Sequence, residues 1–200
     1  VGAAGPDDRY DRTIPAADCA LIPGLVNCHG HAAMTLFRGI ADDLPLKPWL
    51  EERIWPLEAK LTADSVYWGS MLAIAEMIRG GTTTFTDMYF FEEQTAQAVA
   101  ETGMRAVLSR GIVAGPNTQQ ALAESRQLAA AWHGAASGRI TIQLGPHALY
   151  TCPPDLPGSS YPAGLFLSFL LSSYCLSSSA ALSPCPAIHS GPVSGTPPNS

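Results

Sequence analysis

Two histidines separated by one glycine, His29 and His31, are the residues of this sequence with the clearest capacity for chemistry. They end a short apolar run that follows the Pro23-Gly24 turn signal, which predicts a strand over 25–31. Side chains two apart on a strand share a face, so both imidazoles would converge on one point and supply half of a zinc shell. The alternative is a structural pair, because histidines at strand ends also satisfy one another's hydrogen bonds.

The elements that must position these histidines alternate between strand and helix patterns. β-branched runs predict strands, and periodic apolar runs with capping residues and terminal glycines predict helices. The predicted strands cover 25–31, 82–88, 105–112 and 140–147, and the predicted helices cover 49–61 (interrupted at Pro56), Thr62 or Asp64 to Gly80, 92–101 and 118–133. Such alternation predicts parallel βαβ units in an α/β fold. A (β/α)8 barrel needs eight units, so if these four units belong to a barrel, the chain is a truncated barrel, about half of one.

Charge divides the chain into two unlike pieces. All 11 basic and 17 acidic residues lie in 1–155, and 156–200 contains none but has 12 Ser and 7 Pro. Soluble domains carry roughly a quarter charged residues, so we interpret 156–200 as a disordered low-complexity tail or the product of a shifted reading frame. The net charge of −6 argues against a nucleic-acid partner, which would require a basic stripe.

Location is predicted from the cysteines and the amino-terminal residues. Residues 1–13 lack the basic and apolar regions of a signal peptide, and no two cysteines form a C-x-x-C pair. We therefore expect a cytoplasmic protein with free thiols. Residues 161–182 are long and apolar enough to raise a membrane helix, but six serines and no flanking Lys or Arg make membrane attachment a poor interpretation. The five cysteines are Cys19, Cys28, Cys152, Cys175 and Cys185.

The segment IPGLVNCHGH at 22–31 resembles the first barrel strand of the amidohydrolase superfamily, where the pattern is PG, two apolar residues, N or D, and x-H-x-H. The resemblance covers about 18–155. In detail, this stretch resembles the branch of the superfamily that holds 5-methylthioadenosine/S-adenosylhomocysteine deaminases and triazine hydrolases. The further matching segments are MTLFRG at 34–39, ADDLPL at 41–46, WLEE at 49–52, IWP at 54–56, EAKL at 58–61 and GGTTTF at 80–85.

The resemblance implies a role for individual residues. His29 and His31 match metal ligands, with Zn²⁺ the expected cofactor. Glu58 matches a carboxylate that holds ribose hydroxyls, a task suited to two acceptor oxygens. The alternative for Glu58 is an exposed helix carboxylate paired with Arg or Lys.

Three further residues are implied as substrate-binding: Arg110 near the end of the third strand, His147 after the fourth, and Trp49 at the pocket mouth. Their alternatives are a surface salt bridge, a structural histidine and packing. We expect His133 to offset a helix dipole, and Asp87 to be structural.

The remaining residues of the family's site have no counterpart in this sequence. These are a metal-binding His after the fifth strand, an Asp after the eighth, a Glu that shuttles protons, and a further His after the sixth. His189 matches none of them. We therefore assign no catalytic acid or base, and expect the chain to be an inactive fragment of its parent enzyme.

The resemblance implies that the parent enzyme uses zinc-activated water to deaminate an adenosine-type purine nucleoside, releasing ammonia. Two alternatives remain: an aminohydrolase or chlorohydrolase acting on guanine, cytosine or a triazine ring, and a non-catalytic protein anchored by 161–182. The predicted domains are a remnant of a small β-sandwich at 1–21, half a barrel at 22–155 and the tail at 156–200. The sequence leaves a homo-oligomer open.

Overall fold

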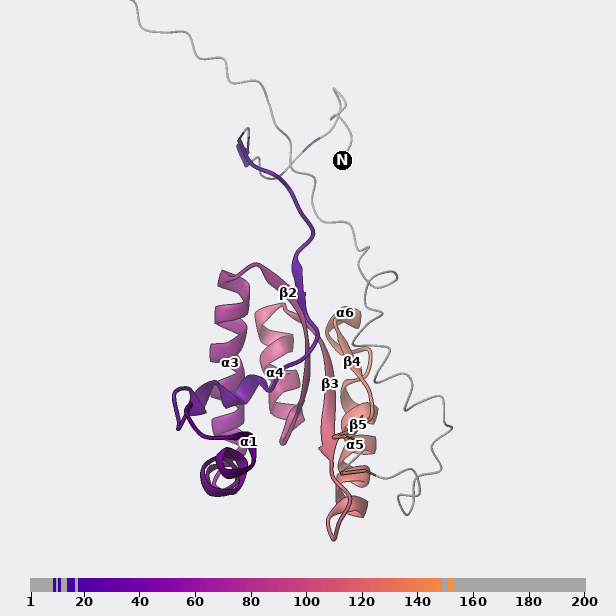
Figure 1. Ribbon diagram of the computed structural model, residues 1–200. Helices are drawn as coiled ribbons and strands as arrows, with labels where there is room; N and C mark the ends of the chain where they lie inside the picture. Colours follow the sequence, from indigo (N-terminus) through magenta and orange to yellow (C-terminus); the bar gives the residue numbers. More distant parts are fainter. Residues whose placement is uncertain (1–8, 10, 12–13, 17, 149–150, 153–200) are drawn as a thin grey trace, which may run out of the picture. The chain divides into compact units, whose positions relative to one another are not determined.

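The computed structural model describes residues 9, 11, 14–16, 18–148 and 151–152 (Figure 1). Every helix and strand of these residues lies within one compact unit, Gly24–Cys175. Before Gly24, the described residues form no strand, and the backbone N–H of Cys19 donates to the carbonyl oxygen of Ala16 at 3.2 Å. The tail from 156 onward lies outside the described residues.

The centre of the unit is a parallel sheet (Figure 1). Its strands stand in the order β1 (Leu25–Asn27), β2 (Thr82–Tyr89), β3 (Arg105–Ile112) and β4 (Ile140–Ile142), and every pair is parallel. A short fifth strand, β5 (Gly145–Pro146), pairs with the carboxyl end of β3. The predicted α/β fold with a parallel sheet is confirmed.

Three long helices connect the strands: α3 (Ala63–Arg79), α4 (Glu92–Thr102) and α5 (Thr118–Trp132). Of the two predicted caps for α3, Thr62 is the one used. Its hydroxyl accepts from the backbone N–H of Ser65 at 3.2 Å, and the Ser65 hydroxyl accepts from the backbone N–H of Thr62 at 2.9 Å. This reciprocal capping box satisfies two N–H groups that the first turn leaves without helical partners.

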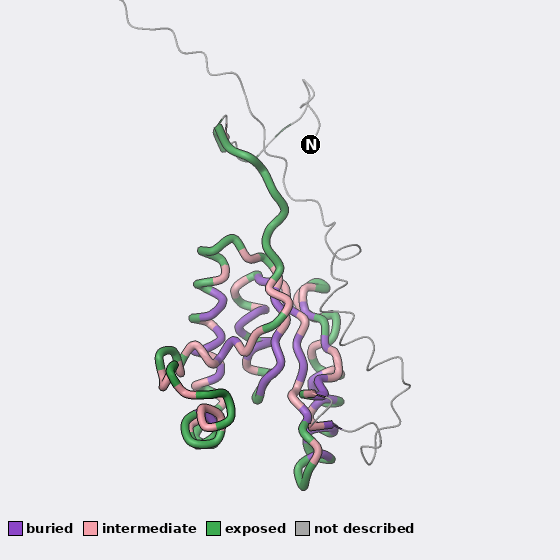
Figure 2. The backbone as a smooth tube through the Cα atoms, in the orientation of Figure 1, coloured by how far each residue is buried: buried purple, intermediate pink, exposed green. Residues whose placement is uncertain are grey.

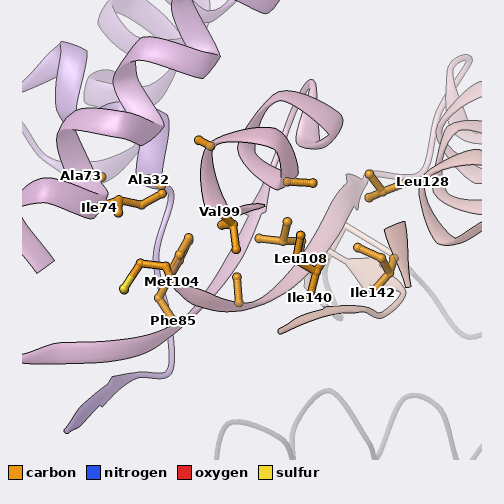
Figure 3. Packing of buried hydrophobic residues seen from close by; sticks show 13 residues of the cluster. Ala32, Ala73, Ile74, Phe85, Val99, Met104, Leu108, Leu128, Ile140 and Ile142 are labelled. Carbon is orange, nitrogen blue, oxygen red and sulfur yellow. The ribbon is translucent and has the colours of Figure 1, made fainter. Parts of the chain in front are cut away.

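Between the helices and the sheet lies the main apolar core (Figure 3). Phe85, Leu108 and Ile140 come from three neighbouring strands, and each is at most 1% exposed. Ile74 of α3 and Val99 of α4 pack against them. Buried residues follow β2, β3 and the helices, whereas 46–58 is mostly half-buried or exposed (Figure 2).

The predicted strand over 25–31 is wrong in extent, because β1 ends at Asn27. The Asn27 carboxamide oxygen accepts from the backbone N–H of His29 at 3.3 Å, which turns the chain out of the strand. The backbone N–H of Met88 still donates to the Gly30 carbonyl oxygen at 3.4 Å, and a 3₁₀ helix, η1 (Ala32–Phe37), follows. Both histidines therefore lie just beyond the strand.

The predicted helix over 49–61 also differs from the structure. A continuous helical segment runs through α1 (Leu46–Pro48), the π-helix η2 (Trp49–Ile54) and α2 (Trp55–Glu58). Pro56 does not interrupt it. The N–H of Trp55 donates to the carbonyl oxygen of Leu50, five residues back, so Pro56 stands where wide turns give way to a new α-helical first turn.

The predicted strand over 140–147 is divided into β4 and β5. Gly145 allows the close approach of the two chains, because a Cβ atom there would lie 2.9 Å from the Arg110 carbonyl oxygen. A short turn, α6 (Ala135–Gly138), precedes β4 and was not expected from the sequence. Its residues Ala136 and Ser137 have positive φ angles of 52° and 59°.

Candidate active site

His31 is held by the carboxyl end of β2. Its Nδ1 lies 2.8 Å from the carbonyl oxygen of Met88. A carbonyl oxygen can only accept, so Nδ1 carries the proton and Nε2 keeps its lone pair. Burial, the largest influence, lowers the pKa of His31 and favours the neutral ring. The ring of His29 stands edge-on to it, with centroids 5.3 Å apart.

This arrangement fits two ligands of a zinc ion. A ligating imidazole usually donates its second N–H to a carbonyl or carboxylate, and His31 does so through Nδ1. The two rings lie side by side, and a turn rather than a strand brings them together. No group of three or more metal-binding side chains occurs within the described part of the chain.

Asp87 holds the backbone immediately after His31. Its carboxylate is fully buried, and Oδ1 accepts from the N–H of Ala32 at 2.9 Å. Burial raises the pKa of Asp87 to about 7, while backbone hydrogen bonds from Ala32 and Met88 oppose that rise. The predicted structural role of Asp87 is to anchor the segment that carries the two histidines.

Glu58, at the end of α2, faces the same region. Its Oε1 accepts from the hydroxyl of Tyr89 at 2.8 Å, and the Tyr89 ring lies 6.0 Å from the His31 ring. Among the described residues, Glu58 forms no ion pair with Arg or Lys, so the alternative drawn from the sequence is not realised.

Arg110, on β3, is held on three sides. Its Nε donates to Glu124 at 2.7 Å, its guanidinium lies 5.0 Å from the Phe90 ring centroid, and a terminal N–H donates to the Gly111 carbonyl oxygen. The salt-bridge alternative is therefore realised. However, the Arg110 side chain is only 17% exposed, whereas that of Glu124 is 37% exposed, so the arginine reaches from a largely buried position to a carboxylate at the surface.

Glu58 and Arg110 line one cleft of about 900 Å³. Its walls combine these two residues with aromatic rings and with further carboxylates, contributed by Trp55, Phe90, Phe91, Trp132, Glu92, Glu93 and Glu124. Two of the four predicted substrate-binding residues thus meet at one surface with both polar and aromatic character. Trp49 and His147 do not line this cleft.

The other predicted substrate residues lie elsewhere. His147 is exposed at the end of β5, and its Nδ1 lies 3.0 Å from the Thr151 hydroxyl. It is near enough for its charge, like that of His29, to lower the pKa of His31, whereas the charge of Glu58 raises it. Trp49 donates from Nε1 to the Ile40 carbonyl oxygen at 3.0 Å, a packing contact within the 40–58 segment.

His133, at the end of α5, has a contact that the sequence did not predict. Its Nδ1 accepts from the backbone N–H of Ile142 at 3.1 Å, which ties the end of α5 to β4.

Tyr89 was missed by sequence reasoning, and Asp87 was undervalued. Both lie two residues apart at the end of a correctly predicted strand. The spacing rule that singled out His29 and His31 applies equally to them.

Comparison of the sequence with known proteins identifies relatives of this chain. Over 150 residues, 74% of this chain and 35% of the relative, the chain is 59% identical to a 5-methylthioadenosine/S-adenosylhomocysteine deaminase of Syntrophomonas wolfei subsp. wolfei. The chain therefore spans about a third of the length of the curated relatives it matches.

Solved structures with a similar fold include two enzymes that contain zinc. A zinc-bound adenosine deaminase from Xanthomonas campestris matches with a TM-score of 0.61 and 41% identity, over 65% of this chain and 30% of that one. A zinc-complexed atrazine chlorohydrolase from Arthrobacter aurescens matches with a TM-score of 0.56 and 22% identity, over 76% and 39%. The sequence profile of the amidohydrolase family matches residues 20–158, and the chain belongs to that family.

Proposed function

We propose that this chain carries the metal-binding and riboside-binding part of an aminohydrolase that deaminates adenosine-type purine nucleosides. The observation that carries the proposal is the pair of imidazoles, His29 and His31, whose ring centroids lie 5.3 Å apart. Nδ1 of His31 is hydrogen-bonded to the Met88 carbonyl oxygen, so the lone pair of Nε2 is available to a metal ion. Glu58 lies close enough to influence the pKa of His31.

Each residue has a proposed task. Bound zinc would lower the pKa of a water ligand and make hydroxide available at neutral pH. His29 and His31 would hold the ion, Glu58 would accept hydrogen bonds from vicinal ribose hydroxyls, and Arg110 and His147 would contact the rest of the nucleoside. For Trp49, we keep only a place at the periphery of the substrate site.

The choice of an adenosine-type substrate is supported by the named activity of relatives that share 53–59% identity with this chain. Guanine deaminases and triazine hydrolases share only 21–22% identity, a likeness that concerns the fold alone. An adenosine riboside is therefore favoured over a free guanine, cytosine or triazine ring.

The domain boundaries also remain proposals. We propose that 22–155 forms the first half of a (β/α)8 barrel, that 1–21 belongs to a flanking β-sandwich, and that 156–200 is a tail unrelated to the barrel. No helix of the described residues is both long and apolar enough to cross a membrane, and 161–182 lies outside them. The described cysteines, Cys19, Cys28 and Cys152, are unpaired, which is compatible with the proposed cytoplasmic location.

Zinc binding, riboside binding and turnover test this proposal separately. Because two histidines alone hold zinc weakly, we expect calorimetric titration of the chain to show weak zinc binding, which His31→Ala weakens further by at least about 100-fold, since even changes behind a ligand cost 10- to 100-fold. The matched control is His133→Gln, which removes an imidazole bonded to the Ile142 backbone. We expect the chain to bind 5′-methylthioadenosine without releasing ammonia, because no proton-transferring residue is assigned.

The outcomes are distinct. Equal zinc binding by the chain and by His31→Ala would overturn the metal assignment. Tighter binding of free guanine or a triazine than of the riboside would favour the alternative substrates. Ammonia release by the chain alone would overturn the proposal that it is inactive.

A further inference from the structure

We propose that Tyr89 is a positioning residue that aims Glu58 at the ribose of the substrate and holds it in register with the metal-binding histidines. This inference rests on the proposed function, because it assigns Glu58 to the ribose hydroxyls. It adds a residue that the sequence had not singled out.

The contacts of Tyr89 link the two parts of the site. Its hydroxyl donates to Oε1 of Glu58 at 2.8 Å, and its ring lies 6.0 Å from that of His31, tilted by 40°. Glu58 and His31 are 27 positions apart in sequence and lie on different elements. Tyr89, at the carboxyl end of β2, contacts both.

Glu58 needs such a support. It is the last residue of the helical segment 46–58, and a carboxylate at the end of a three-bond side chain can rotate unless a partner holds it. Its side chain is half-buried. Among the described residues, Tyr89 supplies the one hydrogen bond to its carboxylate.

Tyr89 is suited to this support because its ring is buried and its hydroxyl donates to Glu58. The residue is 5% exposed, and a buried phenol requires a hydrogen-bond partner. Burial, then the hydrogen bond to Glu58, raises the pKa of Tyr89 well above its usual value, so the hydroxyl remains a donor at neutral pH.

The contact also determines which acceptor sites remain for a ligand. An ionised carboxylate offers about four lone-pair sites on two oxygens. The Tyr89 hydroxyl occupies one site on Oε1, which leaves both sites of Oε2 and one of Oε1. Two vicinal hydroxyls can then each donate to Glu58 while Tyr89 holds its Oε1. A free base has no such hydroxyls and gains nothing from this alignment.

The test compares a riboside with a free base. Tyr89→Phe removes the hydroxyl and keeps the ring against His31. We expect the dissociation constant of 5′-methylthioadenosine, measured by calorimetry on the full chain, to rise about tenfold, as for the loss of one hydrogen bond to a charged group. The dissociation constants of adenine and of zinc should not change.

The chain offers a matched control in Tyr67, whose hydroxyl donates to the Glu101 carboxylate at 2.7 Å between α3 and α4. Tyr67→Phe removes the same chemical contact outside the site and should leave riboside binding unchanged. In a Glu58→Ala background, which removes the acceptor of the Tyr89 hydroxyl, Tyr89→Phe should weaken riboside binding by less than about twofold, because the two changes remove one interaction.

Unchanged riboside binding in Tyr89→Phe, or an equal loss for adenine, would overturn the positioning role and leave the proposed function standing. A wild-type chain that binds the riboside no better than adenine would overturn the riboside assignment, and this inference with it. The wild-type result therefore separates the two failures.

Discussion

The two halves of the sheet differ sharply in what they bury. In the middle of the strands, Phe85 and Leu108 are at most 1% exposed and pack against apolar helix residues. Two positions farther along β2, the buried residue is Asp87, and Ser109 and Glu92 beside it are also at most 1% exposed. Around β2 the buried side chains thus change from apolar to polar toward the carboxyl end, whereas β3 ends in the buried Ile112. We call the region around Phe85 and Leu108 the apolar half, and the region around Asp87, Ser109 and Glu92 the polar half.

This difference separates stability from positioning. Burying a carboxyl group costs free energy that an apolar side chain would not cost. Asp87 uses that buried position to hold Ala32, the residue after His31. We infer that the apolar half supplies most of the free energy that stabilises the fold. The polar half lowers that stability somewhat, and its buried groups position the site.

The largest effect is expected in the apolar half. Phe85→Ala should lower the free energy of unfolding by about 4 kcal/mol, because it removes a fully buried ring and leaves a cavity. Urea denaturation measures this loss. The control is Leu72→Ala on α3, which is 45% exposed and should cost no more than about 0.5 kcal/mol. Equal losses in the two variants would contradict the assignment of stability to this core.

The polar half should make the free energy of unfolding depend on pH. Because burial raises the pKa of Asp87 to about 7, the folded chain binds a proton that the unfolded chain releases between pH about 4 and about 7. Stability should therefore fall as pH rises through that interval. Asp87→Asn lacks this ionisation, so its stability relative to wild type should increase with pH, as measured by urea denaturation.

Glu92→Gln should change in the same direction, because burial and then the Asp87 charge raise the pKa of Glu92 as well. A stability difference between wild type and Asp87→Asn that stays constant over this interval would contradict the buried ionisation.

The sequence predicted most of the apolar half and only part of the polar half. The strands 82–88 and 105–112 are correct to within one residue, because β-branched runs and terminal glycines determine them locally. The Thr62 cap was predicted from a local pattern as well.

The contacts of Tyr89 with Glu58 and of Asp87 with Ala32 join residues 31 and 55 positions apart. They depend on the tertiary fold, which no local pattern encodes. The end of β1 was mispredicted for a related reason: the Asn27 side chain competes with the strand for the backbone N–H of His29.

A smaller effect is expected where the polar half supports the metal ligands. Asp87→Ala should weaken zinc binding by about tenfold, because the carboxylate anchors the backbone beside His31 and is not itself among the proposed ligands. Asp87→Asn retains an acceptor oxygen for the Ala32 N–H and should lose less. Calorimetric titration with zinc checks both variants, and an equal loss would show that charge, rather than the hydrogen bond, is responsible.

The smallest expected effect is a difference in stability loss between alanine substitutions at two buried serines. Ser109 donates from Oγ to the Asp87 carbonyl oxygen at 3.1 Å between strands, whereas Ser125 donates to the Ala121 carbonyl oxygen one turn back in α5. Ser109→Ala should lower the free energy of unfolding by about 1 kcal/mol, the value of one buried hydrogen bond. Ser125→Ala should cost less, because alanine is the better helix former and the carbonyl keeps its helical partner. Urea denaturation of both variants measures the difference, and a larger loss in Ser125→Ala would show that the polar contacts of β2 and β3 do not hold the sheet ends together.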